Sequence, residues 1–325
     1  MKLTSIYHFM LLCLVQLLLA CSKPQTKAEL SFNHAPHGSV NAYISEDGQY
    51  SVNINHDNTV YFWNLKKQSL TYIWQQSSQL NDPIYLAHIA SNNQYVVTAA
   101  SSAFALWDAH SGKNLGYWQV KDAKIRDIKV NNAGSAIFIA QSDGKIIVFN
   151  PNQQSRLEFY GHSHAVNHLD IDDQGEWVLS VADDYSALYW HAATGKVKHK
   201  YTMPSRIHFA KLLTANLGYI TTTTEHQIID LHSGVVKFSL AGLDKTYTSA
   251  AYWYAEQNYL ITGHSQQQIN LWDIKTGKRI KTWSAQAKSS RAVDGGMIQS
   301  LAIDHEYPYI VSQSSIGFTE YWKIP

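Results

Sequence analysis

Residues 161–196 read GHSHAVNHLDIDDQGEWVLSVADDYSALYWHAATGK, and they contain the pattern that organises the whole chain. A short apolar run ends at Trp190, and the polar turn His191–Lys196 (HAATGK) follows at once. The same kind of turn follows a short apolar or aromatic run at Asp108–Lys113 (DAHSGK), Asp230–Val235 (DLHSGV) and Asp273–Lys278 (DIKTGK). The recurrence predicts a chain built from internal repeats.

The repeat has a period of about 43 residues. Seven short runs end at an aromatic or apolar residue, namely Trp63, Trp107, Phe149, Trp190, Ile229, Trp272 and Trp322. The intervals between them are 44, 42, 41, 39, 43 and 50 residues. A second aromatic precedes five of these positions by 12 or 13 residues: Tyr50, Tyr95, Trp177, Tyr259 and Tyr309. Short β-rich runs bounded by Gly, Asn, Asp and Ser predict strand–turn–strand units.

These residues resemble the WD-repeat family of β-propellers over nearly all of residues 28–325. The resemblance implies an all-β fold with seven blades. In the quoted segment Gly161-His162, Ser180, Asp184 and Trp190-His191 stand at the family's Gly-His, Ser/Thr, Asp and Trp-Asp positions. The resemblance therefore implies a buried structural hydrogen-bond network of His162, Ser180, Asp184 and Trp190. Other repeats depart from the pattern at Ser101, Thr223, Ile229, Gln266 and Ile316.

The two ends of the repeat region predict how the ring closes. Glu29-Leu30-Ser31-Phe32 parallels Arg156-Leu157-Glu158-Phe159, the outer strand that precedes the fourth repeat. The sequence stops at Pro325, directly after the third strand expected for the last repeat. We therefore expect the N-terminal strand to complete the last blade, which removes the exposed strand edges of an open ring.

The first residues predict export and a lipid anchor. Lys2 precedes an apolar stretch of 11 residues, Met10–Ala20, which is shorter than the about 20 residues of a membrane-spanning helix. Leu18-Leu19-Ala20-Cys21 resembles a bacterial lipobox, so residues 1–20 are interpreted as a lipoprotein signal peptide and residues 21–27 as a lipidated linker. Cys13 leaves with the signal, so Cys21 has no disulfide partner in the mature chain. Ser22 after the Cys implies sorting to the outer membrane, with the protein facing the periplasm.

Composition excludes several classes of function. Charged residues are 16% and aromatic residues 12% of the chain, which argues against disorder. The formal net charge of +1 gives no electrostatic basis for binding nucleic acid.

The sequence carries no recognisable catalytic or cofactor motif, and we expect no cofactor. His162, His164 and His168 lie near Asp170, but on a strand this group spans about 20 Å, so we expect no metal site. Asp127, Asp170 and Asp304 fall in inner-strand contexts. They are the residues to examine for an enzyme with its site at the mouth of the channel.

Two segments are candidates for partner binding. Tyr252, Trp253 and Tyr254 are consecutive aromatics on one strand, so at least one must lie on each face of the sheet. The longest interval between repeats contains the polar stretch 284–300, with Lys288, Arg291 and Asp294. Connections of this length are usually functional or disordered.

The sequence therefore predicts a non-catalytic, outer-membrane-anchored periplasmic lipoprotein that acts as a protein–protein interaction scaffold. Its expected partners are envelope proteins or peptides, and the membrane through the N-terminal lipid. One alternative is a periplasmic propeller enzyme, a hydrolase or lyase with its site at the channel mouth. Another is a binder of glycans or small ligands, which would show a concave aromatic-lined pocket.

Overall fold

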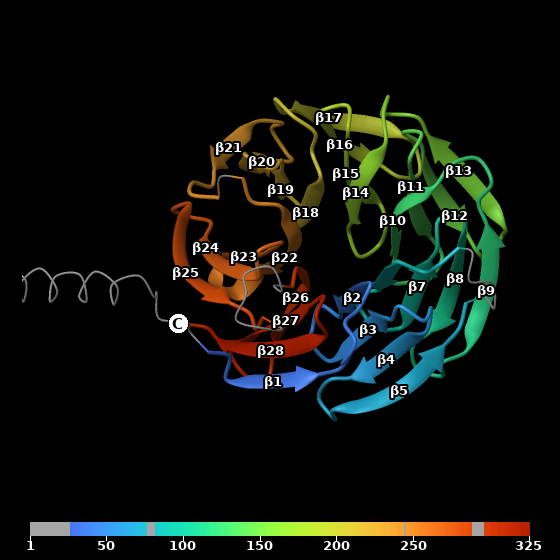
Figure 1. The fold of residues 1–325 in the computed structure, drawn as a ribbon. Helices are drawn as coiled ribbons and strands as arrows, with labels where there is room; N and C mark the ends of the chain where they lie inside the picture. The colour runs from blue at the N-terminus through green and yellow to red at the C-terminus, as the bar shows by residue number, and fades with distance from the viewer. Residues whose placement is uncertain (1–26, 77–81, 244, 288–295) are drawn as a thin grey trace, which may run out of the picture.

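A computed structural model describes residues 27–76, 82–243, 245–287 and 296–325. These residues form strands β1–β28 and one 3-10 turn, η1 (Ala255–Gln257). The strands make seven four-stranded antiparallel sheets, which are arranged as blades around a central axis (Figure 1). The predicted all-β seven-bladed propeller is confirmed. Among the described residues, no helix has the length and apolar character needed to cross a bilayer.

The first three blades follow the sequence from the inner to the outer strand. Blade one comprises β2 (Asn41–Ile44), β3 (Tyr50–Ile54), β4 (Val60–Asn64) and β5 (Ser69–Trp74). Blade two comprises β6 (Leu86–Ile89), β7 (Tyr95–Ala99), β8 (Ala103–Asp108) and β9 (Asn114–Gln119). Blade three comprises β10 (Ile125–Val130), β11 (Ile137–Gln141), β12 (Ile146–Asn150) and β13 (Ser155–Phe159).

The next three blades have the same order, and the seventh does not. Blade four comprises β14 (Val166–Ile171), β15 (Trp177–Ala182), β16 (Ser186–His191) and β17 (Lys196–Thr202). Blade five comprises β18 (Phe209–Thr214), β19 (Leu217–Thr221), β20 (His226–Asp230) and β21 (Val236–Ser239). Blade six comprises β22 (Thr248–Tyr254), β23 (Tyr259–His264), β24 (Gln268–Asp273) and β25 (Lys278–Ser284). Blade seven comprises β26 (Ile298–Asp304), β27 (Tyr309–Ser314), β28 (Phe318–Lys323) and β1 (Leu30–Asn33).

The two aromatic positions of the repeat have fixed places in a blade. The residue that ends each run lies on the third strand, as Trp190 does on β16. The aromatic 12 or 13 residues earlier begins the second strand, as Trp177 begins β15. Each repeat read from the sequence therefore supplies the second and third strands of one blade.

The recurring polar turn joins the third strand to the fourth. At Asp108–Lys113 the carboxylate Oδ1 of Asp108 accepts the backbone N–H groups of His110 (3.0 Å) and Ser111 (2.7 Å). Gly112 then adopts a positive φ of 71°, and a side chain there would collide with the ring of Tyr72. An Asp that caps the turn and a Gly in the left-handed region explain why DxxxGK recurs.

Aromatic stacking holds neighbouring blades together. Phe159 on the outer strand of blade three lies flat against Trp190 of blade four, with ring centroids 3.9 Å apart and an interplanar angle of 6°. Trp74 of blade one stacks in the same way on Trp107 of blade two, at 4.9 Å and 13°. Such pairs add about 0.5–1.5 kcal/mol beyond the area they bury. The hydrophobic core is therefore a series of layers between blades.

The ring closes through the N-terminal strand, as predicted. Strand β1 pairs antiparallel with β28, with Leu30 opposite Tyr321 and Phe32 opposite Thr319 (Figure 1). The backbone N–H of Glu29 also donates to the carbonyl of Tyr321 (2.9 Å). Residues from opposite ends of the chain thus share one sheet.

A buried carboxylate makes this closure dependent on pH. Glu320 lies on β28, opposite Ser31 of β1. Burial raises the pKa of Glu320 to about 7, although the backbone N–H of Gln286 donates to its carboxylate (3.2 Å). The folded state therefore favours the neutral form, and this stabilisation is present below pH 4.5 and lost as the pH rises through 7. We expect the free energy of unfolding to fall by up to about 3 kcal/mol between pH 4 and pH 8.

Glu320→Gln is the matched variant, because it keeps the shape of the side chain and removes the titration. Thermal melts of both proteins across this pH range measure the effect. If the variant showed the same pH dependence of stability as the wild type, that dependence would come from other groups than Glu320.

Candidate functional site

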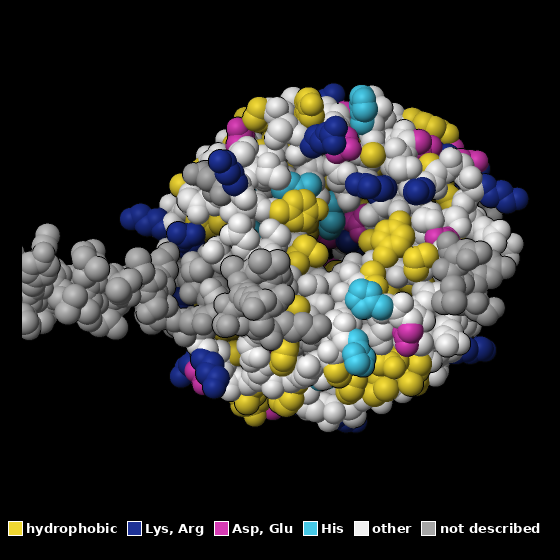
Figure 2. All heavy atoms as spheres, in the orientation of Figure 1, with side chains coloured by type: hydrophobic (Ala, Val, Ile, Leu, Met, Phe, Trp, Pro, Cys, Tyr) yellow, Lys and Arg dark blue, Asp and Glu magenta, His cyan; other side chains and the backbone are white. Residues whose placement is uncertain are grey.

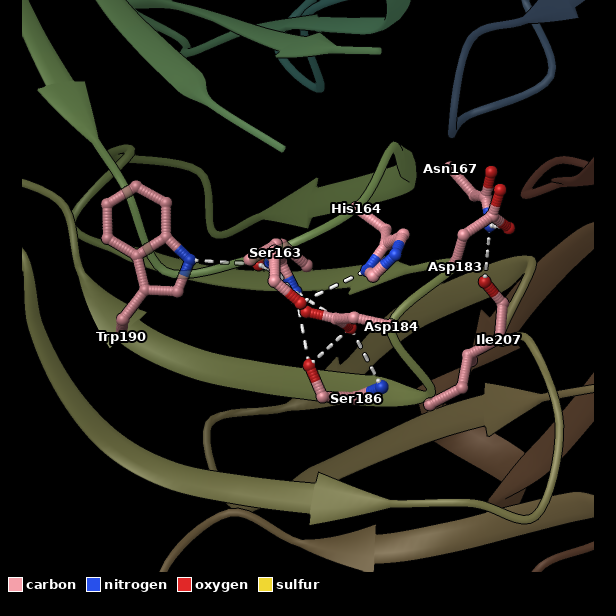
Figure 3. A network of polar contacts seen from close by, with 10 residues as sticks. Ser163, His164, Asn167, Asp183, Asp184, Ser186, Trp190 and Ile207 are labelled. Atoms are coloured by element: carbon pink, nitrogen blue, oxygen red, sulfur yellow. Dashed lines mark hydrogen bonds and ion pairs between the residues drawn. The ribbon is translucent and has the colours of Figure 1, made fainter. Parts of the chain in front are cut away.

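The four blade-four residues named from the sequence form one chain of hydrogen bonds (Figure 3). The indole N–H of Trp190 donates to Ser180 Oγ (3.1 Å), and Ser180 Oγ is 2.9 Å from His162 Nε2. On its other side, His162 Nδ1 lies 3.2 Å from Asp184 Oδ2. Because the ionised carboxylate of Asp184 can only accept, the imidazole proton lies on Nδ1, and Nε2 accepts from the hydroxyl of Ser180.

Asp184 stays ionised in this network. Burial alone raises the pKa of Asp184, but hydrogen bonds from His162, the Ser186 hydroxyl (2.7 Å) and the Ser163 backbone N–H (3.0 Å) outweigh it and hold the pKa well below its usual range. The side chains of His162, Ser180 and Trp190 are buried. The network therefore fixes the connection at Ser163 to the blade and offers no surface to a partner.

Shorter versions of the network occur in three other blades, where the Trp of the repeat bonds to a Thr or Ser that sequence reasoning missed. The indole N–H donates from Trp107 to Thr98 (2.9 Å), from Trp272 to Thr262 (3.0 Å) and from Trp322 to Ser312 (2.8 Å). The signal was available, since each Thr or Ser lies nine or ten residues before its Trp, as Ser180 does.

The inner strands of all seven blades surround a narrow central cavity of about 170 Å³. Two ion pairs line it: Lys129 Nζ lies 3.1 Å from Asp127 Oδ1 on the same strand, and Lys211 Nζ lies 3.3 Å from Asp170 Oδ2 on the neighbouring blade. Lys211 is also 3.3 Å from Glu46 Oε1, on the β2–β3 turn of blade one. The channel is thus filled by charges that compensate one another.

The channel carboxylates also join successive blades. Asp127 on β10 accepts the backbone N–H of Leu169 on β14 (2.9 Å), and Asp170 on β14 accepts that of Leu212 on β18 (2.8 Å). Of the three aspartates named as catalytic candidates, these two line the channel. Asp304 lies at the end of β26 and accepts the backbone N–H of Glu306 (2.9 Å), so it stabilises a turn.

Burial keeps the channel histidines His88 and His168 neutral, whereas neighbouring carboxylates keep Lys211 charged. Burial lowers the pKa of His168 to about 4, even though Asp127 opposes the shift, and it lowers that of His88 well below its usual value. For Lys211, burial alone lowers the pKa, but Asp170 and Glu46 raise it well above the ordinary value. At neutral pH these groups stabilise one another, and their arrangement suits a structural axis.

The channel opens onto a wider depression. The connections from the outer strand of one blade to the inner strand of the next lie on one side of the ring, which we call the connection face. A depression of about 500 Å³ on this face is lined by Arg126, Asn167, Asp183, Tyr185, Ser205, Arg206, His208, Thr223 and Tyr247. In Figure 2 the ring is hollowed at its centre, with acidic, basic and His side chains visible inside.

Two tyrosines and two arginines define the chemistry of this depression. Tyr185 is 47% exposed and Tyr247 is 42% exposed. The ring of Tyr247 stacks on His208, with centroids 4.1 Å apart, and burial lowers the pKa of His208 to about 4. Arg126 donates to Asn167 Oδ1 (2.9 Å), and Arg206 lies 3.9 Å from Asp183. Aromatic side chains therefore line the depression, and its two arginines outnumber its single carboxylate, Asp183.

Comparison with known proteins agrees with this architecture. A family model described as "WD domain, G-beta repeat" matches residues 153–191, which contain most of blade four. The chain is a seven-bladed β-propeller that contains a WD40 repeat. A chain from the "Crystal Structure of Mitotic Checkpoint Complex" aligns with a TM-score of 0.78 over 94% of this chain and 95% of its own length. Its sequence identity is 12%, so this likeness shows the fold alone.

Curated relatives of this WD40 propeller include subunit I of eukaryotic translation initiation factor 3. The protein of Culex quinquefasciatus is 28% identical over 181 residues, which cover 50% of this chain and 55% of the relative. That of Schizosaccharomyces pombe is 24% identical over 191 residues, covering 54% and 58%. The chain therefore spans little more than half the length of the curated relatives it matches.

The other residues that the sequence suggested for partner binding, lipidation or metal binding lie in different parts of the chain. Tyr252 is buried and 9% exposed, whereas Trp253 and Tyr254 are half-buried, so the three aromatics divide between the faces of β22. Cys21 and the loop residues Lys288, Arg291 and Asp294 lie outside the described residues. His164 is exposed and His168 points toward Asp127 in the channel, away from His162. Within the described residues, no group of three His, Cys, Asp or Glu side chains is placed to hold a metal ion.

Proposed function

We propose that this propeller is a non-catalytic binding scaffold that a lipid on Cys21 anchors to the outer membrane, facing the periplasm. Its partners are envelope proteins or extended peptides, which it binds at the depression on the connection face. The observation that carries the proposal is the depression itself, where exposed Tyr185 and Tyr247 stand beside Arg126 and Arg206. Tyr and Arg are the side chains most often responsible for binding energy at interfaces.

Three further observations support a scaffold. The ring is closed and its channel charges are mutually compensated, so the depression has a rigid floor. The curated relatives are named as a subunit of a larger factor, which agrees with a role in assembly. The resemblance to a lipobox supports the location, because an anchored protein searches for partners on one surface and modest contacts then suffice.

Site-specific photo-crosslinking in cells tests the proposal. A photo-reactive amino acid at position 185 or 247 is expected to capture the same envelope protein, because both side chains reach into the depression. The matched controls are positions 73 and 157, where Ile73 and Leu157 are as exposed but lie on outer strands. Equal capture at all four positions, or no capture at 185 and 247, would contradict a partner site in the depression.

Two substitutions test the affinity for the partner and the location of the protein. Tyr247→Ala is expected to weaken binding of the captured partner about thirtyfold, the usual effect of truncating a central aromatic anchor. Cys21→Ala is expected to move the protein from the membrane fraction to the soluble periplasm. A Cys21→Ala protein that stays in the outer membrane would disprove the lipid anchor and leave the binding site unaffected.

A further inference from the structure

A second cavity lies on the side of the ring opposite the connection face. It is a groove of about 440 Å³ between blades four and five, and we call it the blade four–five groove. Trp177, Tyr189 and Lys198 form its blade-four wall, and Leu212–Ala215 form its blade-five wall. The β14–β15 turn contributes Asp172 and Asp173. None of these residues belongs to the depression on the connection face.

The blade-four wall presents aromatic faces that already hold an ammonium group. Trp177 stacks on Tyr189, with centroids 4.8 Å apart and an interplanar angle of 21°. The Nζ atom of Lys198 lies 5.4 Å from the ring centroid of Trp177 and 5.6 Å from that of Tyr189. Cations are attracted to such faces by the negative charge above an aromatic ring. Lys198 is an exposed side chain on an outer strand, so it can leave these rings for solvent.

The groove has an excess of negative charge. Four carboxylates line it, and the two cations are Lys198 and Lys211. Lys211 is half-buried at the inner end and compensates Glu46 and Asp170, as described above. Asp172 and Asp173 form no ion pair among the described residues. Asp172 accepts the backbone N–H of Glu176 (2.7 Å), and Asp173 accepts the hydroxyl of Ser91 (2.6 Å). Both carboxylates therefore lie at the rim without a compensating cation among the described residues.

We propose that the blade four–five groove binds an organic cation, a primary ammonium or guanidinium group on an alkyl stem. The charged group takes the place of the Lys198 ammonium over Trp177, and the carboxylates of Asp172 and Asp173 attract it. The apolar wall at Leu212 suits the stem. Such a group occurs in free polyamines and in the basic side chains of peptides. The site is separate from the depression, so it does not rest on the scaffold function.

Lys198 provides a test that distinguishes this site from a surface that is only acidic. If Lys198 competes with the ligand for the aromatic faces, Lys198→Ala removes the competitor and binding becomes about two- to fivefold tighter. The matched control is Lys200→Ala, which removes the same charge from the same strand outside the groove. Asp173→Asn keeps an acceptor for Ser91 and removes the charge, and it is expected to weaken binding severalfold.

Isothermal titration of the purified full-length protein with spermidine and with Nα-acetyl-arginine amide measures these effects. Saturable binding of spermidine alone assigns a free polyamine, and binding of the arginine amide assigns a basic peptide side chain. Maltotriose is the neutral control. The proposal is overturned if Lys198→Ala matches Lys200→Ala or the wild type. It is also overturned if maltotriose binds as well as the cations, or if neither cation saturates below about 1 mM.

Discussion

Deleting Leu30–Asn33 is expected to lower the melting midpoint of the propeller by about 10 °C or more. These four residues form β1, the only strand in the described ring that comes from the other end of the chain. Without them β28 becomes an open edge, and the third strand of blade seven loses its outer neighbour. Because every blade packs between two others, opening one joint weakens the whole ring.

The side chains of β28 explain why the effect is large. Thr319, Glu320, Tyr321 and Trp322 are all buried in the closed ring. Phe32 of β1 packs on Tyr321 edge to face, with ring centroids 6.1 Å apart, and it contacts the core of blades six and seven. The truncated chain exposes this surface together with unpaired backbone groups, so we also expect it to associate with other copies.

Differential scanning calorimetry of the truncated and intact proteins measures the change. Leu30→Ser is the control, because the Leu30 side chain is 48% exposed and the substitution keeps the strand pairing. Its midpoint is expected to stay within about 2 °C of the wild type. A synthetic peptide of residues 27–36 is expected to restore part of the lost stability to the truncated protein. If truncation left the midpoint unchanged, closure by β1 would contribute nothing to stability.

The blades and their closure were predictable because their signals are local and repeated. Each Trp position with its following polar turn marks a third strand, and the resemblance between residues 29–32 and 156–159 marks the closing strand. The blade-four network could be named for the same reason, since all four residues belong to one repeat. Contacts between residues of the same repeat can therefore be predicted from the sequence.

Only part of the channel was predictable, because most of its contacts join different blades. Asp127 and Asp170 were named as inner-strand residues, but their partners Lys129 and Lys211 were not. A signal did exist, since equivalent positions of successive blades meet around the axis. Glu46, His88, Lys129, Asp170, Lys211 and Tyr252 follow one another at intervals of 41 or 42 residues. Comparing charges one repeat apart would have placed Asp170 beside Lys211. The blade four–five groove has no such signal, because its cavity depends on how two blades pack.

The second large effect is expected from Asp170→Ala, which should destabilise the propeller by about 3–5 kcal/mol. This single substitution removes both the buried partner of Lys211 and the acceptor of the Leu212 backbone N–H. The Lys211 ammonium then keeps only Glu46, whose side chain is 44% exposed, and the Leu212 N–H is left without its acceptor, so both groups carry a desolvation cost. Urea unfolding measures the loss. Asp304→Ala is the control, since Asp304 caps a turn outside the channel, and it is expected to cost about 1 kcal/mol or less.

A double variant separates a structural axis from a catalytic one. Asp170→Asn keeps an oxygen that can accept the Leu212 N–H, and Lys211→Met replaces the ammonium with an apolar group of similar length. Lys211→Met leaves the buried Asp170 carboxylate without its counter-ion, and Asp170→Asn leaves Lys211 with Glu46 alone, whereas the double variant removes both charges of the pair. We therefore expect the double variant to be more stable than Lys211→Met alone, with a coupling energy of about 1–3 kcal/mol. Additive losses, or an Asp170→Ala protein as stable as the wild type, would mean that the pair does not hold the blades together. Asp170 would then be free for another role, and the channel would again be a candidate for chemistry.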